Sequence, residues 1–525
     1  MSTTATRRGA QTPPPAGEMS HREIVEVLVG LLSILFVAMV SVTIVSVALP
    51  TIIGALDGTQ RAYTWVVTAS LLAMTVSSPL WSKMADLFDK KRLVQVAAVL
   101  FLLGSFGAGF AQDVPQLLAA RGLQGLGMGG VMALVQAIMG AIISPRQRGR
   151  YVGYMAAVMA VATVSGPLIG GLIVDTLGWR WTFFVAVPFT VVGIALIQRY
   201  LHLAPLRREV RIDWWGALFI SVAASLPLVW VSFAGKEFAW VSTETGLFLG
   251  GTAVALAAAV AVERRHVEPV VAPHIVRDRT TYLAIIASLA VGIAQFGASV
   301  FLSQYFQVAQ GFSPTAAGLL MLPMIFGTMA GSTVSGRLIT KTGIWKRYLL
   351  LGSVLLIVGL ALMGPIDHET PIWHLSIFMV LMGLGTGMLM QNLVLVVQNT
   401  VDVRDIGAAS GVVSFFRSLG GTIGIAALGA VLAARVGDMI AAGLQEAGIK
   451  ATGGATTLDI EGLPPAVQEI VRNAYADATG RIFLISAVVT VVTLVAVWLM
   501  PEAELRTTVA KTAAKRVEPA EDVKV

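Results

Sequence analysis

The chain contains fourteen apolar runs, each close to the length that a helix needs to cross a membrane. They lie near residues 27–49, 62–81, 93–111, 117–143, 151–174, 182–198, 214–233, 245–262, 282–307, 315–336, 348–364, 372–399, 408–433 and 482–500. A helix needs roughly 20 mostly apolar residues to span the hydrocarbon core. Charged residues make up 13% of the chain, against about 25% in soluble proteins. The sequence therefore predicts an all-α integral membrane protein with 14 transmembrane helices, and it excludes soluble enzymes and nucleic-acid-binding domains.

Lysine and arginine residues fall mostly on one side of these runs. If the N-terminus is cytoplasmic, 28 of the 37 basic residues lie in cytoplasmic segments and 7 lie outside, while Arg121 and Arg417 lie within runs. Cytoplasmic loops of membrane proteins carry an excess of basic residues. We therefore expect a multi-pass protein of the cell (plasma) membrane, with both termini in the cytoplasm and an even number of spans.

The two halves of the chain resemble each other at a constant offset. The segment GLGMG (125–129) reappears as GLGTG (383–387), 258 residues later. At the same offset Arg146, Gly149, Gly153 and Gly166 match Arg404, Gly407, Gly411 and Gly424. A string of matches in order at one offset indicates an internal repeat. We infer two six-helix repeats, spans 1–6 and 9–14, with an extra two-helix hairpin, spans 7–8, between them.

This repeat divides the chain into five parts. They are a cytoplasmic N-terminal tail (1–26), an N-terminal six-helix bundle (27–198), the inserted hairpin with its flanking cytoplasmic loops (199–281), a C-terminal six-helix bundle (282–500) and a cytoplasmic C-terminal tail (501–525). The C-terminal bundle includes an extracytoplasmic loop (434–481), in which the apolar face of Pro464 to Ala476 predicts a short interfacial helix. Two six-helix halves in a parallel repeat are typical of transporters that bind substrate between the halves.

Two segments carry more specific signals. The loop after the second run reads SKMADLFDKKR (82–92), and it places Asp86 near several bases, where an acid can latch the ends of two helices. The fifth run reads ATVSGPLIGG (162–171), in which a proline kinks the helix and glycines allow close helix approach. Both are similar to motifs of the major facilitator superfamily, and the second resembles the antiporter signature of its fourteen-span drug:proton antiporter family.

The resemblance covers about residues 24 to 500. It implies a secondary transporter that exports drugs, antibiotics or other amphiphilic small molecules in exchange for protons by alternating access. The residues to which it assigns coupling and gating are Arg121, Asp86, Lys90, Lys91 and Arg92, and those of the antiporter motif are Gly166, Pro167, Gly170 and Gly171. The three bases could instead be a plain positive-inside anchor. We expect no enzyme activity, cofactor, metal or nucleic-acid partner, and a monomer in the lipid bilayer.

Arg121 and Arg417 place permanent charges within apolar runs, where a charge costs a few kcal/mol and marks a functional residue. The alternatives are a snorkelling side chain for Arg121 and a lock on backbone carbonyls for Arg417. No Asp or Glu lies well inside any run, and Ser41 stands where the family has an aspartate. We therefore expect neutral or anionic amphiphiles as substrates. The candidate pocket residues are Arg417, Gln124, Gln136, Ser41, Gln391 and Asn392.

Two other functions stay open. One is an importer or facilitator of a metabolite, against which the antiporter string in the fifth run argues. The other is a membrane sensor without transport, although neither a nucleophile–base pair nor an appended soluble domain supports a sensor or a membrane enzyme in this sequence.

Overall fold

The computed structural model describes residues 21–56, 58, 60–142, 158, 161–162, 165–166, 168–201, 214–233, 238–239, 241–265, 273–401, 406–448 and 464–502. Its first helices are α1 (His21–Ala55), α2 (Gln60–Leu87), α3 (Lys90–Gly109), α4 (Val114–Ile142), a helix over Leu168–Leu177, α6 (Trp181–Phe184) and α7 (Ala186–Tyr200). The others are α8 (Trp214–Phe233), α9 (Thr243–Glu263), α10 (Pro273–Arg277), α11 (Arg279–Gln304) with its π-helical continuation η1 (Tyr305–Ala309), α12 (Pro314–Leu320), α13 (Leu322–Thr342), α14 (Lys346–Leu362), α15 (Ile372–Thr400), α16 (Ile406–Glu446) and α17 (Pro465–Leu499).

Eleven helices in the described part of the chain are long and apolar enough to cross a membrane. Each of the other three predicted spans corresponds to a shorter or partly described helix. These are the helix over Leu168–Leu177, α8 with its apolar part Leu218–Pro227, and α14 with 17 residues. The all-helical architecture is confirmed, and the count of fourteen spans stays a prediction.

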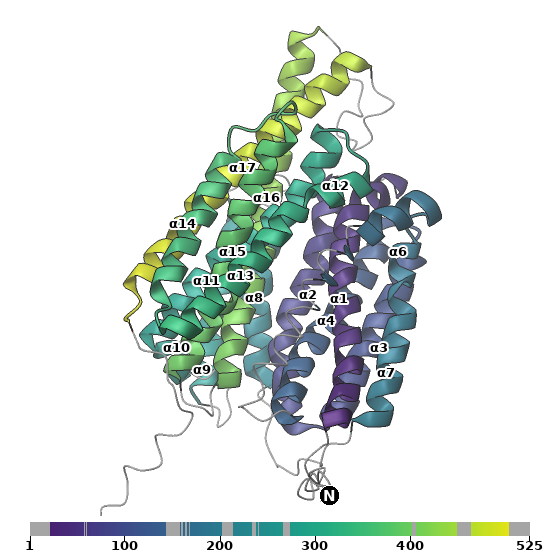
Figure 1. Cartoon of the computed structure of the whole chain (residues 1–525). Helices are drawn as coiled ribbons and strands as arrows, with labels where there is room; N and C mark the ends of the chain where they lie inside the picture. Colours follow the sequence, from purple (N-terminus) through teal and green to yellow (C-terminus); the bar gives the residue numbers. More distant parts are fainter. Residues whose placement is uncertain are drawn as a thin grey trace, which may run out of the picture.

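The helices form two bundles that stand side by side (Figure 1). In the N-terminal bundle α1 packs on α4 and α7, α2 packs on α4, and α3 packs on α4 and α7. In the C-terminal bundle α11 packs on α15 and α17, α13 packs on α15, and α14 packs on α15 and α17. The two sets of pairs therefore correspond, helix by helix, in chain order. We call the end of the bundles at which α1 begins the proximal end and the end at which α1 finishes the distal end.

The hairpin of α8 and α9 lies against both bundles. Its two helices pack on each other, and α8 also contacts α2 of the first bundle and α16 of the second. The rings of Trp65 on α2 and Phe233 on α8 have centroids 5.8 Å apart. By contrast, α9 leaves most of its apolar side chains exposed, as a helix that faces lipid does. The hairpin therefore covers the outside of the contact between the bundles through α8.

Glycines set the spacing of the helices within each bundle. A Cβ atom on Gly125 of α4 would overlap the carbonyl oxygen of Ser70 on α2. In the second bundle a Cβ on Gly383 or Gly387 of α15 would overlap a carbonyl oxygen of α13. Lipid supplies no hydrophobic drive for helix association, so small residues that let backbones touch are what hold such helices together. The repeated GLGMG and GLGTG segments are therefore packing surfaces of α4 and α15.

Cations at the proximal end bind the last carbonyl groups of each bundle. Lys91, at the start of α3, donates from Nζ to the carbonyl oxygen of Gln198 on α7 at 2.7 Å. Lys346, at the start of α14, donates from Nζ to the carbonyl oxygen of Met500 just after α17, also at 2.7 Å. Cations are favourable at helix C-termini, where carbonyl groups lack partners. In both bundles, therefore, a lysine at the start of the third or the corresponding helix donates a hydrogen bond to the end of the last helix.

The last two long helices extend beyond the rest of the C-terminal bundle at the distal end (Figure 1). α16 has 41 residues and α17 has 35, so they are about 60 and 50 Å long, against about 30 Å for the hydrocarbon core. The extension is closed by buried apolar residues and by an ion pair of 2.6 Å between Arg435 Nε and Asp477 Oδ1. The predicted helix over Pro464 to Ala476 exists, but the expectation of a separate interfacial helix is wrong, because α17 continues through it without a break.

Exposed tryptophans lie at both ends of the bundles. Trp181 and Trp373 lie at the distal end, and Trp215 and Trp498 lie at the proximal end. Tryptophan is enriched where a protein crosses the two membrane–water interfaces. These residues therefore mark two levels between which the helices face hydrocarbon.

The glycine contacts predict which small substitutions the fold tolerates. We expect Gly387→Ala to lower the thermal unfolding temperature of the protein in detergent, because the added methyl group meets the backbone of α13. Gly437→Ala on α16 is the matched control, since nothing lies within 4 Å of its Cβ position. This control should be neutral or stabilising by up to about 1 kcal/mol, the helix propensity gain of alanine. Equal unfolding temperatures for the two variants would contradict the role of Gly387.

Candidate functional site

Arg121 lies inside the N-terminal bundle in a closed hydrogen-bond network. Its side chain is 1% exposed. The guanidinium donates to Ser70 Oγ at 2.8 Å, to the carbonyl oxygen of Val66 at 3.4 Å and to Gln124 Oε1. Gln124 in turn donates from Nε2 to Ser105 Oγ on α3 at 2.8 Å. Arg121 is therefore held by protein acceptors on α2 and α4 and does not snorkel to an interface.

Arg417 lies on α16 in a more open setting. Its side chain is half-buried. Nη1 donates to the carbonyl oxygen of Met390 on α15 at 3.3 Å. The next residue along α15, Gln391, is exposed, as is Gln136 on α4 of the other bundle. Exposed glutamines on otherwise apolar spans are candidates for contact with a polar substrate.

Two predicted pocket residues hold helices together instead. Gln124 belongs to the Arg121 network, where its side-chain oxygen and nitrogen are both bonded. Asn392 is buried and donates from Nδ2 to Ser335 Oγ on α13 at 2.8 Å and to the carbonyl oxygen of Met388 at 2.7 Å. The structure therefore places these two side chains in helix contacts within a single bundle.

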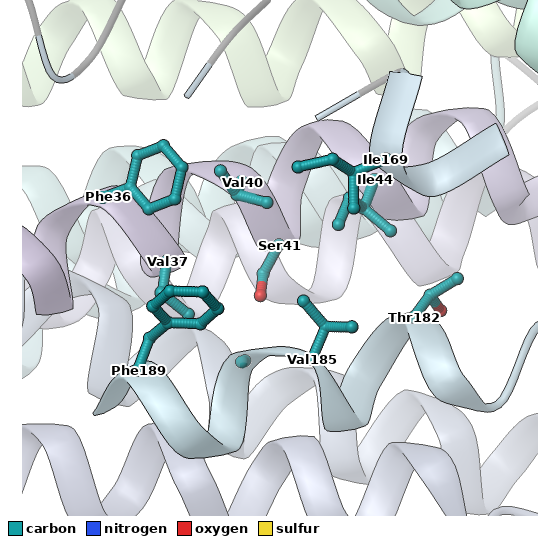
Figure 2. Close-up of a pocket in the computed structure, with 10 residues that line it drawn as sticks. Phe36, Val37, Val40, Ser41, Ile44, Ile169, Thr182, Val185 and Phe189 are labelled. Carbon is teal, nitrogen blue, oxygen red and sulfur yellow. The ribbon is translucent and has the colours of Figure 1, made fainter. Parts of the chain in front are cut away.

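Ser41 lines a small cavity inside the N-terminal bundle. The cavity has a volume of about 40 Å³ and lies between α1, α6, α7 and the helix over Leu168–Leu177. Figure 2 shows the Ser41 hydroxyl pointing into it among apolar neighbours such as Val185 and Phe189. Drug-sized ligands need roughly 300–1,000 Å³, so this cavity has room for a few water molecules at most and not for a drug.

The basic loop makes contacts within its own bundle. Lys90 is nearly buried, Lys91 binds the end of α7, and Arg92 Nε lies 3.8 Å from Asp89 Oδ2 on the surface. The side chain of Asp86, in the last turn of α2, lies outside the described residues. Lys91 therefore has a structural contact that the gating interpretation did not include.

The antiporter motif lies against α1 and α12. A Cβ on Gly166 would overlap Thr43 Oγ1 of α1, and a Cβ on Gly170 would lie 3.0 Å from Ile44 Cα. A Cβ on Gly171 would lie 2.5 Å from Thr315 Cα, in the other bundle. Pro167 lies outside the described residues. The motif therefore packs the fifth helix both inside its own bundle and against the second one.

Two hydrogen bonds between the two bundles lie at the distal end. Thr315 Oγ1 donates to Asp175 Oδ2 at 2.7 Å. Gln307 Nε2 on η1 donates to the carbonyl oxygen of Val47 on α1 at 3.4 Å. Asp175 follows Gly171 by four residues, so both lie on the same face of their helix and meet Thr315 together. We call Asp175, Gly171 and Thr315 the distal latch.

The distal end of α11 is fixed to its own bundle. Tyr305 Oη donates to the carbonyl oxygen of Asp367 at 2.6 Å, and Gln310 Nε2 donates to that of Thr370 at 3.1 Å. Thr370 Oγ1 also donates to Asp367 Oδ1 at 2.7 Å, and this bond holds the pKa of that carboxyl below its usual value. Gln307 is therefore fixed to the C-terminal bundle, and its hydrogen bond to Val47 on α1 joins the two bundles.

With this arrangement in view, residues 31–425 match the Major Facilitator Superfamily. The chain belongs to this superfamily. It is a multi-pass membrane transporter and not an enzyme.

Curated relatives and solved structures agree with this family. The chain is 34% identical to an uncharacterized MFS-type transporter of Mycobacterium tuberculosis, over 89% of this chain and 68% of the relative. It is 32% identical to the multidrug transporter protein MdtP of Bacillus subtilis, over 81% of this chain and 78% of MdtP. It matches a bacterial homologue of the human lysosomal transporter Spinster, solved in an inward-facing conformation, at 16% identity with a TM-score of 0.62, over 92% of this chain and 97% of that one. At this identity the match shows the fold alone.

The sequence did not reveal the partners that complete these sites. Ser70 and Ser105 bind the Arg121 network, and Thr315 and Gln307 join the bundles. Hydroxyl and amide residues of this kind are scattered through all spans, so type and spacing do not distinguish them. The four-residue step from Gly171 to Asp175 was the one available signal for the distal latch.

The distal latch predicts a change in the opening of the distal end. The chain has no cysteine, so Thr64→Cys, which faces Gly429 of the other bundle, gives a single reporter for maleimide labelling in detergent. When Thr315→Val is combined with Thr64→Cys, we expect the introduced cysteine to be labelled about fivefold faster than in Thr64→Cys alone. The reason is that loss of a hydrogen bond worth about 1 kcal/mol favours separation of the bundles.

Thr176→Val is the control for this measurement. Among the described residues, Thr176 Oγ1 donates to the carbonyl oxygen of Leu172 in its own helix alone, at 2.6 Å. The control should label at the reference rate. An unchanged rate in Thr315→Val would show that the latch does not hold the bundles together.

Proposed function

We propose that the protein exports drugs, antibiotics or other amphiphilic small molecules across the cell membrane in exchange for protons. The observation that carries this proposal is the distal latch, in which the antiporter motif of one bundle closes on the other. The names of the relatives, which include a multidrug transporter, support export of such molecules. Two separately packed bundles joined at one end are suited to alternating access, in which each side opens in turn.

The packing supports a repeat of six helices. Corresponding helices of the two bundles make corresponding contacts, and both bundles bind the end of their last helix through a lysine. Within this proposal the bundles comprise residues 27–198 and 282–500. The hairpin within 199–281 adds two spans and brings the total to fourteen.

The charge distribution supports an orientation with both termini in the cytoplasm. The proximal end carries Lys91 and Lys346, and cytoplasmic ends are the basic ones. The distal latch then lies on the outer side of the membrane. The described arrangement is therefore one in which the bundles meet outside, as expected before substrate enters from the cytoplasm.

Proton coupling is assigned to side chains near the Arg121 network and the two ends of the bundles. Arg121 keeps its charge at physiological pH, so it acts by setting the field around a titrating partner and not by carrying the proton. The candidate carboxylates are Asp86, in the last turn of α2, and Asp175 at the distal end. Asp175 accepts a hydrogen bond from Thr315 of the other bundle, so it acts directly on the outer contact.

Everted membrane vesicles test this function. With pyrenebutyrate, pyrenebutanol and pyrenebutylamine as probes, we expect at least one to accumulate when respiration acidifies the vesicle lumen. Nigericin together with valinomycin, which remove the pH gradient and the membrane potential, should abolish the accumulation, because exchange for protons is driven by these two gradients alone. Pyrene fluorescence measures the uptake.

Gly171→Leu is the inactive variant for this assay, since its side chain has no room beside Thr315. We expect it to reduce uptake at least tenfold, a loss of about 1.4 kcal/mol or more in the closed state. Gly437→Leu, at an open position of α16, should retain uptake. Release of probe from an acidified lumen would indicate an importer, and the absence of movement for every probe would contradict transport.

A further inference from the structure

The two intramembrane arginines, Arg121 and Arg417, differ in burial and in hydrogen bonding. Arg121 is almost fully buried and donates to three acceptors. Arg417 is half-buried and donates to one. Both carry the same fixed charge in the same kind of helix, so their different surroundings indicate different roles. The protein supplies hydrogen-bond acceptors for Arg121, whereas Arg417 has donors without partners in the described structure.

Arg417 lies deep in the membrane-spanning part of the protein. It follows the start of α16 at Ile406 by eleven residues, a rise of about 16 Å along the helix. The hydrocarbon core is about 30 Å thick. The guanidinium therefore lies near the middle of the span, too deep to reach water at either interface by extending its side chain.

The guanidinium has donors to spare. Arginine carries five N–H donors and no acceptor. In the described part of the chain its one bond, from Nη1 to the carbonyl oxygen of Met390, is 3.3 Å long. None of the ion pairs among described residues includes it. Among the described residues, no nitrogen of the Arg417 side chain is both fully buried and without a hydrogen-bond partner. The donors that form no hydrogen bond are therefore accessible.

We propose that Arg417 binds the anionic group of the exported amphiphile, a carboxylate or an ionised phenol, between α15 and α16. This inference rests on the export function proposed above and names the substrate class of that site. A guanidinium binds a carboxylate through two parallel charge-assisted hydrogen bonds. The unused donors of Arg417 are sufficient for that geometry while the bond to Met390 is kept.

Helix α11 packs on the backbone of α16 at Arg417. A Cβ on Gly292 would overlap the carbonyl oxygen of Arg417, so the two helices touch there. Ser288 and Gln295 lie one turn on either side of Gly292 and share its face of α11. Ser288 Oγ and Gln295 Oε1 are buried and have no hydrogen-bond partner in the described structure.

The same arrangement disfavours cationic substrates. A cation near Arg417 would be repelled across a medium of low dielectric constant, where charges interact more strongly than in water. No carboxylate among the described residues pairs with Arg417 to offset that repulsion. The site therefore selects by charge, in the order anion, neutral molecule, cation.

Equilibrium binding to the full-length protein in detergent tests this order. The probes are pyrenebutyrate, pyrenebutanol and pyrenebutylamine, which share one ring system, and energy transfer from the tryptophans to pyrene measures Kd. We expect pyrenebutyrate to bind at least about tenfold more tightly than pyrenebutylamine, as one charge-assisted contact provides. In Arg417→Gln this ratio should fall to about one, through weaker binding of the anion and tighter binding of the cation.

Two further variants separate binding from structure. Arg417→Lys keeps the charge, so it should keep the preference for the anion with weaker binding. Arg279→Gln, which removes an arginine that binds the carbonyl oxygen of Leu499, should leave all three Kd values unchanged. The inference is overturned if no probe binds, if wild type binds the amine as tightly as the acid, or if Arg417→Gln weakens all three probes equally. Anion preference without uptake in vesicles would contradict the export function and leave this inference standing.

Discussion

Close approach of helices through glycine is the constraint on which this structure depends. Inside lipid, apolar side chains gain nothing by turning from lipid to protein, so helices associate where their backbones can touch. Gly125 brings α4 to α2, Gly383 and Gly387 bring α15 to α13, and Gly292 brings α11 to α16. The same device acts between the bundles at Gly171. Close glycine contacts therefore stabilise each bundle, and together with the hydrogen bonds of Thr315 and Gln307 they close one bundle on the other.

The polar residues make use of this tight frame. Because α2 and α4 touch, Ser70 and a backbone carbonyl come within reach of Arg121, and the charge is satisfied by protein alone. Around Arg417 the backbone contact is equally tight on the α11 side, but the side chain has one acceptor. Buried charges without partners are costly. The helix packing therefore buries Arg121 among its hydrogen-bond partners and leaves donors of Arg417 free to bind a ligand.

Apolar run length predicted the all-helical architecture, since span length is a local property of the chain, while the repeat inferred from the 258-residue offset stays a prediction. Contacts between distant residues could not be predicted in this way. Asp175 and Thr315 are 140 residues apart, and Arg121 meets Ser70 over a separation of 51. Lys91 illustrates the limit, because its place in a basic loop favoured gating whereas the structure shows it binding the end of α7. Ser41 and Asn392 were predicted to line a substrate pocket, and the structure places Ser41 at a small cavity and Asn392 in a contact between α15 and α13. Which face of a helix meets a substrate depends on the packing of both bundles.

The continuity of α16 and α17 into the distal extension has a mechanical consequence. Neither helix breaks where it leaves the level of the other helices, and Arg435 and Asp477 hold the pair together at the base. The extension is thus a stiff lever arm about 20–30 Å long, from the residues in excess of a single span. A small rotation of the C-terminal bundle moves the tip of this arm farther than any part of the bundle itself. Its tip is therefore where a spectroscopic label would register the motion of the bundle with the greatest amplitude.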